Sequence, residues 1–158
     1  MADESARLPR RVLLDTNIFI VGYGPRTSAE ESILSFLSAH RAETTLLLSN
    51  EILNQVSRVA KRVKGKDWAG LLLSYFWRDF NVDVVNLEDA GDLLGQYKDR
   101  IPSKDLLVFL TGLVGQADCF ITRNHALLKA ALGQHPPFEC LTPEEFLAKY
   151  VAPKPNQN

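Results

Sequence analysis

The chain has 158 residues, of which 46% are hydrophobic and 23% charged, with a formal net charge of −1. This length predicts one domain, and the balanced charge excludes a uniformly basic nucleic-acid coat while leaving room for a local basic patch. No apolar run approaches the length of a membrane span, and no signal peptide is visible. We therefore expect a cytoplasmic protein without membrane association, in which Cys119 and Cys140 are buried thiols.

Short apolar runs alternate with helical patterns along the chain. Strands are expected at residues 12–14, 46–48, 82–85, 119–122 and 138–141. Helices are expected over 28–37, 49–63, 68–76, 86–97, 103–114 and 126–131, with a further helix after a capping box at Thr142. Gly22, Gly24 and Pro25 mark a loop. The alternation predicts an α/β fold, with helices on both faces of a parallel sheet in a single domain over residues 11–151, between flexible tails at 1–10 and 152–158.

Polar residues follow two of these strands, at the edge where ligands bind in open α/β sheets. Asp15 ends the first strand, and Asp105 lies in the first turn of the helix that leads into the fourth. Glu51 lies just past the second strand, so three carboxylates are expected to gather in one cleft. Carboxylates placed together need a cation to stay ionised, and their hard oxygen ligands suit Mg²⁺ or Mn²⁺. Such an ion can activate water for phosphodiester hydrolysis.

Each acidic residue also has a purely structural interpretation. Asp15 could cap the following helix, and Asp105 and Glu51 occupy first turns, where carboxylates favour the helix dipole whatever the function. Asp118 precedes the fourth strand and is about 13 Å of extended chain from the carboxyl edge, so we interpret it as a turn residue.

Four segments resemble the PIN domain family and are most similar to members grouped with VapC-like toxin components. They are residues 14–19, 103–118, 120–124 and 141–147, and the likeness covers roughly residues 11–150. The resemblance implies a three-layer α/β/α sandwich with a central parallel sheet of about five strands. It also implies a Mg²⁺- or Mn²⁺-dependent endoribonuclease, with RNA as substrate and an antitoxin protein as partner. Asp15 corresponds to the first metal-binding acid of the family and Asp105 to the third.

Two positions depart from the family pattern. The register of the second acid falls on Gln55, and Glu51, one turn earlier on the same helix face, is its candidate substitute. The fourth acid is replaced by Asn124, which can orient a water molecule or bind metal through its carbonyl. The residues assigned to catalysis are Asp15, Asp105, Glu51 and Asn124. Those assigned to substrate binding are Asn17, Thr122 and Arg123.

Other functions stay open. A non-catalytic module that binds RNA or a protein would explain the neutral residues Gln55 and Asn124. A haloacid-dehalogenase-like phosphatase also has an Asp after its first strand, but it needs a second Asp where Asn17 stands. The basic run of residues 58–66 either binds RNA phosphates or forms the solvated face of a helix. The aromatic residues of 68–77 fit core packing or a homodimer.

Overall fold

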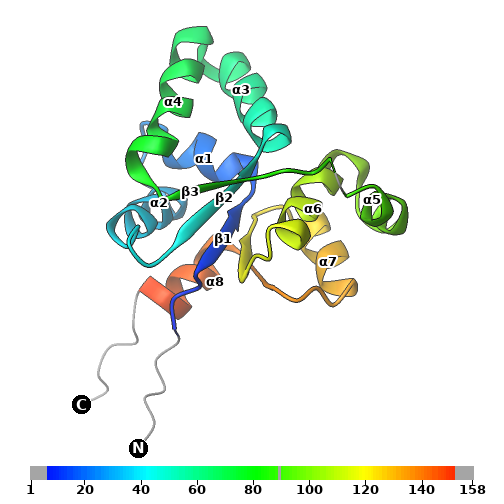
Figure 1. Cartoon of the computed structure of the whole chain (residues 1–158). Coiled ribbons are helices and arrows are strands. Elements are labelled where there is room, and N and C mark those ends of the chain that lie inside the picture. The colour runs from blue at the N-terminus through cyan, green and yellow to red at the C-terminus, as the bar shows by residue number, and fades with distance from the viewer. Residues whose placement is uncertain (1–6, 89, 152–158) are drawn as a thin grey trace, which may run out of the picture.

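A parallel β-sheet forms the centre of the part of the chain that this computed structural model describes, residues 7–88 and 90–151. In these residues five strands lie in the order β3-β2-β1-β4-β5 (Figure 1). They are β1 (Arg11–Leu14), β2 (Thr45–Ser49), β3 (Val82–Val85), β4 (Cys119–Ile121) and β5 (Glu139–Leu141). The predicted α/β fold with a central parallel sheet is confirmed. Of the predicted tails, residues 1–6 and 152–158 lie outside the described residues.

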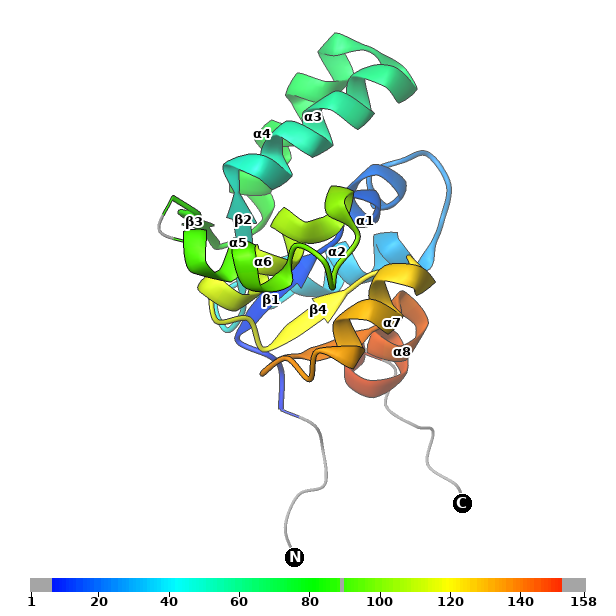
Figure 2. The same ribbon diagram turned by 90° about the vertical axis from the view of Figure 1, so that its right-hand side faces the viewer.

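Helices cover both faces of the sheet, which makes three layers (Figures 1 and 2). The helices are α1 (Thr16–Gly22), α2 (Ala29–Ala39), α3 (Asn50–Lys64), α4 (Lys66–Asp79), α5 (Gly91–Tyr97), α6 (Leu106–Val114), α7 (His125–Gly133) and α8 (Pro143–Phe146). Helices α1, α2 and α8 lie on one face, and α5, α6 and α7 lie on the other. Helices α3 and α4 pack against each other as a hairpin, which projects beyond the sheet (Figure 2). The predicted three-layer sandwich is therefore confirmed.

The apolar runs of the sequence become buried strands because both faces of the sheet are covered. Val12–Leu14 in β1 and Leu46–Leu48 in β2 are buried, and Leu13 pairs with Leu47. Strand β3 lies at the sheet edge and tolerates Asp83, whose carboxylate accepts a 2.5 Å hydrogen bond from the guanidinium of Arg11. The sheet therefore has an apolar centre, and its charged groups lie at the ends and edges.

Several local predictions need correction. A helix, α1, begins directly after Asp15, so the expected loop around Gly22 starts later than predicted. Helix α5 begins at Gly91 rather than at Asn86, whose side chain instead accepts a hydrogen bond from the backbone of Glu88 in a turn. The segment before α6 is a 3₁₀ turn, Ser103–Asp105. At two of these points a short polar side chain, Asp15 or Asn86, bonds locally to the backbone.

Three further features are the capping box at Thr142, the two cysteines and the hydropathy of the helices. Thr142 forms the predicted capping box with Glu145 at the start of α8. Cys119 and Cys140 are buried, as expected, and burial raises the pKa of the Cys140 thiol to about 11. Within the described residues, no helix combines the length and apolar character needed to span a membrane.

Candidate metal site

Asp15 stands at the carboxyl end of the central strand and is held by both neighbouring elements. Its backbone N–H donates to the carbonyl of Ile121 at 3.0 Å, which continues the pairing of β1 with β4. Its Oδ1 accepts from the N–H of Thr16 at 2.8 Å, and its Oδ2 accepts from the hydroxyl of Thr122 at 2.6 Å. The capping interpretation of Asp15 is therefore correct. Each oxygen still has a lone pair for a further ligand, so capping does not exclude metal binding.

Asp105 is buried at the end of the 3₁₀ turn, with 7% of its surface exposed. Burial raises the pKa of its carboxyl above the usual range, and the negative charge of Asp15 raises it further, whereas Lys104 lowers it. Its Oδ2 is buried without a hydrogen-bond partner in the described part of the chain. A carboxylate oxygen removed from water needs a donor or a cation. Asp105 thus lacks a donor or cation for its Oδ2, and it feels the charge of a second carboxylate, that of Asp15.

The helix that follows Asp105 is fixed to the same edge of the sheet. The hydroxyl of Thr111, in α6, lies 2.9 Å from the hydroxyl of Ser49 at the end of β2, and both side chains are buried. The Thr111 hydroxyl also bonds to the carbonyl of Leu107 one turn earlier. This contact between α6 and β2 keeps the start of α6, and with it Asp105, at the carboxyl edge.

Glu51 does not join Asp15 and Asp105. It lines a separate hollow of about 300 Å³ between the start of α3 and the segment after β3, together with Val85 and Asn86. Gln55, one turn further along α3, instead contacts the residue after Asp15, because its side-chain oxygen accepts a hydrogen bond from the hydroxyl of Thr16. One helical turn displaces a residue by about 5.4 Å, which is why Glu51 does not replace Gln55.

The predicted cluster of three carboxylates is therefore corrected. Among the described residues, no group of three or more His, Cys, Asp or Glu side chains is placed to hold a metal ion. Asp15 and Asp105 lie near enough for the negative charge of Asp15 to raise the pKa of Asp105. Mg²⁺ and similar ions often use one or two carboxylates, with water and substrate phosphate completing the shell. The unpartnered Oδ2 of Asp105 and the open lone pairs of Asp15 fit such an ion.

A hollow of about 330 Å³ opens beside Asp15 and is lined by two of the three predicted substrate-binding residues, Asn17 and Arg123. It is lined by Asn17, Arg123 and Asn124, with Ile18, Val21 and Glu30. The side-chain oxygen of Asn124 accepts from the N–H of Leu127 and so caps α7, while its backbone N–H donates to Thr122. Asn17 is exposed toward this hollow, whereas Thr122 is fully buried and acts on Asp15. Thr122 is thus a positioning residue and does not line the hollow.

Arg123 is already paired with two carboxylates. Its guanidinium donates to both oxygens of Glu30, at 2.8 and 3.1 Å, and to both oxygens of Glu144. Hydrogen bonds to Glu30 and then Glu144 raise the pKa of Arg123 further above its usual value. Glu30 is buried, and a buried carboxylate needs such a partner. The ion pairs join α2 and α8 at the rim of the hollow.

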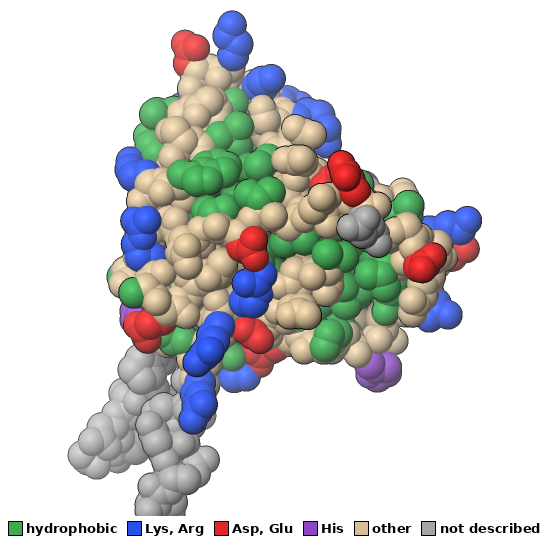
Figure 3. All heavy atoms as spheres, in the orientation of Figure 1, with side chains coloured by type: hydrophobic (Ala, Val, Ile, Leu, Met, Phe, Trp, Pro, Cys, Tyr) green, Lys and Arg blue, Asp and Glu red, His purple; other side chains and the backbone are tan. Residues whose placement is uncertain are grey.

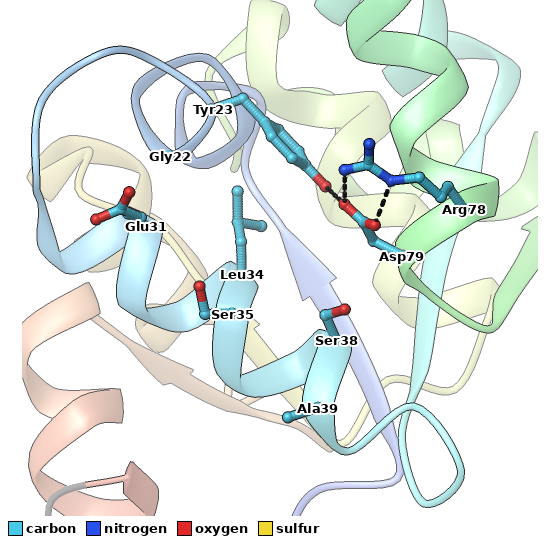
Figure 4. A pocket seen from close by; sticks show the side chains of 9 residues that line it. All are labelled: Gly22, Tyr23, Glu31, Leu34, Ser35, Ser38, Ala39, Arg78 and Asp79. Atoms are coloured by element: carbon cyan, nitrogen blue, oxygen red, sulfur yellow. Dashed lines mark hydrogen bonds and ion pairs between the residues drawn. The ribbon is translucent and has the colours of Figure 1, made fainter.

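A second hollow, of about 460 Å³, lies between α1, α2 and α4 and is not part of this site (Figure 4). The hydroxyl of Tyr23 donates to Asp79 at 2.7 Å, and Arg78 donates to both oxygens of the same carboxylate. The hydrogen bonds from Arg78 lower the pKa of Asp79, while burial and the bond to Asp79 raise that of Tyr23. Tyr23, Arg78 and Asp79 thus satisfy one another within this hollow.

The fold and the paired carboxylates define a three-layer α/β/α protein with an acidic site at the carboxyl edge of a parallel sheet. No family model and no curated protein matches the chain. Among solved structures, it is similar to VapBC2 from Rickettsia felis, determined bound to a DNA fragment from their promoter, with 17% identity and a TM-score of 0.61. It is also similar to FitAcB from Neisseria gonorrhoeae, with 15% identity and a TM-score of 0.58. Both matches cover 84% of this chain and 98% of the other.

These comparisons correct the family prediction. At 15–17% identity the structural likeness reaches the fold alone, and no family model matches the sequence. The chain is therefore not placed in the PIN family or among VapC-like toxin components. The short motifs that carried the resemblance, such as Asp15 to Asn17, occur in this chain as strand ends and helix caps. Such motifs arise wherever a parallel strand leads into a helix.

Proposed function

We propose that this chain is a Mg²⁺- or Mn²⁺-dependent endoribonuclease in which Asp15 and Asp105 hold the ion. The observation that carries the proposal is the buried Oδ2 of Asp105, which has no partner among the described residues and lies within the electrostatic influence of Asp15. A bound divalent ion supplies an activated water molecule and charge stabilisation at the scissile phosphate.

The chain's own side chains position this acidic pair. Thr122 donates to Asp15 and fixes the orientation of its carboxylate, as partners of metal ligands commonly do. The side-chain oxygen of Gln55 accepts a hydrogen bond from the hydroxyl of Thr16 and so stabilises the first turn of α1. The backbone N–H of Thr16 in that turn donates to Asp15. Asn17 lies at the exposed rim of the adjoining hollow, where it can donate to a substrate oxygen.

A place in a toxin–antitoxin pair is part of the proposal. The structural neighbours VapBC2 and FitAcB are toxin–antitoxin complexes, and VapBC2 was determined with promoter DNA. This likeness of fold supports a protein partner for the present chain. The reading frame adjacent to its gene is the first place to look for that partner, and co-expression followed by co-purification tests the pairing.

A second function is favoured by one specific observation. Gln55 is neutral, Glu51 faces another hollow, and the described residues place no third carboxylate with Asp15 and Asp105. A site with only two acids fits a module that binds RNA or a protein without cleaving it. Calorimetric titration with Mn²⁺ separates the two functions, because a folded protein that binds no ion favours the module.

The test of the nuclease is cleavage of RNA in the presence of Mg²⁺ or Mn²⁺. Asp15→Asn and Asp105→Asn are each expected to reduce the rate by at least about a hundredfold, since each removes a charged ligand. Glu51→Gln is the matched control and keeps the activity of the wild type. Equal cleavage by the wild type and both Asp variants would identify a contaminating nuclease and refute the proposal.

A further inference from the structure

Helix α3 carries a row of basic side chains that leads outward from the acidic site. Arg58, Lys61 and Arg62 are exposed and stand three and four residues apart, so they share one face of the helix. Gln55 precedes Arg58 by three residues on the same face and accepts a hydrogen bond from Thr16, beside Asp15. The basic stripe, defined as Arg58, Lys61 and Arg62, therefore begins one turn from Gln55, whose partner Thr16 follows Asp15 in the chain.

The charges of the basic stripe are not neutralised within the described residues, where no carboxylate forms an ion pair with any of its three side chains. Lys64 and Lys66 follow directly, and Lys64 lies over the ring of Trp68, 5.7 Å from its centroid. The chain as a whole has a net charge of −1, so this concentration of positive charge is local. Lys and Arg side chains gather over the end of the molecule where α3 and α4 lie (Figure 3).

The position of the stripe also favours an external ligand. Residues 61–67 are all exposed, and the α3–α4 hairpin projects from the body of the protein (Figure 2). Basic residues in the last turn of a helix stabilise its dipole, which explains Lys61 and Arg62 in part. Arg58 stands before the last turn, where that effect has faded, and it continues the row toward Gln55.

We propose that the basic stripe binds the sugar–phosphate backbone of the RNA substrate and guides it into the acidic site. The inference rests on the proposed function, because it assigns the surface that holds the same RNA. From Gln55 to Arg62 the helix rises about 10 Å, which corresponds to about three stacked nucleotides. The substrate is thus an RNA that extends beyond the scissile phosphate along α3. Lys and Arg bind such a backbone through its charge, without reading its sequence.

The test measures RNA binding in EDTA, so that no cleavage occurs. Fluorescence anisotropy follows a labelled single-stranded RNA of about 20 nucleotides at increasing salt, for the wild type and for Arg58→Gln/Lys61→Gln/Arg62→Gln. The triple variant is expected to bind RNA about tenfold more weakly at low salt. The slope of the logarithm of the association constant against the logarithm of the salt concentration becomes shallower by about 2, since each lost phosphate contact removes about 0.7.

Two controls keep the result specific. Arg10→Gln/Lys98→Gln/Lys129→Gln removes the same charge from exposed positions elsewhere and binds like the wild type. Arg58→Lys/Lys61→Arg/Arg62→Lys keeps the charge of the stripe and also binds like the wild type, while thermal unfolding verifies that each variant folds. The inference is overturned if Arg10→Gln/Lys98→Gln/Lys129→Gln weakens RNA binding as much as the stripe variant does. It is also overturned if the stripe variant binds RNA like the wild type, which would point to an acidic protein partner.

The outcome is independent of the nuclease test. RNA binding that depends on the stripe, without cleavage in Mg²⁺ or Mn²⁺, refutes the nuclease and leaves the binding surface standing. Cleavage of a long RNA at the same rate by the wild type and the stripe variant refutes the binding surface and leaves the nuclease standing.

Discussion

Replacing Asp105 by Asn is expected to stabilise the metal-free protein. The wild-type carboxylate is buried, its Oδ2 has no partner in the described residues, and the charge of Asp15 opposes its ionisation. The amide has a similar shape and no charge, so the variant removes the electrostatic penalty and keeps the packing. An unsatisfied buried polar group costs about 1–3 kcal/mol and more when it is charged, so we expect replacement by the neutral amide to gain about 1 kcal/mol. For a chain of this size that gain raises Tm by about 3 °C.

The pH dependence of this gain follows from the raised pKa of Asp105. The folded protein holds the Asp105 proton more tightly than the unfolded chain does. The stability contributed by the protonated carboxyl is therefore fully present below its ordinary pKa, and it is lost as the pH rises through the raised value. The advantage of Asp105→Asn is consequently largest at neutral pH and shrinks as the solution is acidified.

Thermal unfolding of the wild type and the variant, in EDTA and in Mn²⁺, measures these effects. At a Mn²⁺ concentration of about 100 times Kd, the wild type gains about 2.7 kcal/mol, and the variant gains little because it has lost a charged ligand. The order of stability therefore reverses between the two conditions. A variant that is less stable than the wild type in EDTA would show that Asp105 makes a structural bond, and would refute the reasoning.

Three further predictions concern the residues around the site and the packing of the end of α6 on the sheet. Thr122→Val removes the hydroxyl that donates to Asp15, and we expect it to lower the Mn²⁺ affinity, measured by calorimetry, about tenfold. Thr122→Ser keeps the hydroxyl and is expected to keep the affinity. Equal affinity of both variants would exclude a positioning role for Thr122. Glu51→Gln leaves Mn²⁺ affinity unchanged because Glu51 lines another hollow, and a loss would place Glu51 in the metal shell. Gly115→Ala puts a Cβ 2.8 Å from the carbonyl oxygen of Thr111 and 2.7 Å from the side chain of Val85. We expect this crowding to lower the free energy of unfolding, measured in urea, by about 1–3 kcal/mol. An unchanged unfolding midpoint would show that this contact between α6 and β3 relaxes freely.

The sheet could be predicted from the sequence because its strands are buried on both faces. Runs such as Val12–Leu14 and Leu46–Leu48 are continuous and apolar, and helical patterns separate them, so one parallel arrangement fits. Helix α1 was missed because Ile18, Phe19 and Ile20 follow one another without the spacing of an amphipathic helix, on a segment packed against α2 and α3. Tertiary packing, not periodicity, fixes such a short helix.

The candidate site could be predicted only in part, for a geometric reason. Asp15 follows a strand, so its position at the sheet edge comes directly from the topology. Glu51 and Gln55 lie on a helix, and the orientation of that helix decides which of them contacts the start of α1. The sequence does not contain this orientation. The pairing of Arg123 with Glu30 joins residues far apart in the chain and had no local signal. Asp118 was interpreted correctly, since its carboxylate accepts from the backbone of Arg10 and Arg11 at the amino edge.

The most direct test of the central claim is the binding of Mn²⁺ followed by electron paramagnetic resonance at neutral pH. The wild type is expected to bind the ion at a site that both Asp15→Asn and Asp105→Asn abolish, while Glu51→Gln leaves it intact. Binding that survives in either Asp variant with the wild-type affinity would show that these two carboxylates do not share an ion, and would contradict the account.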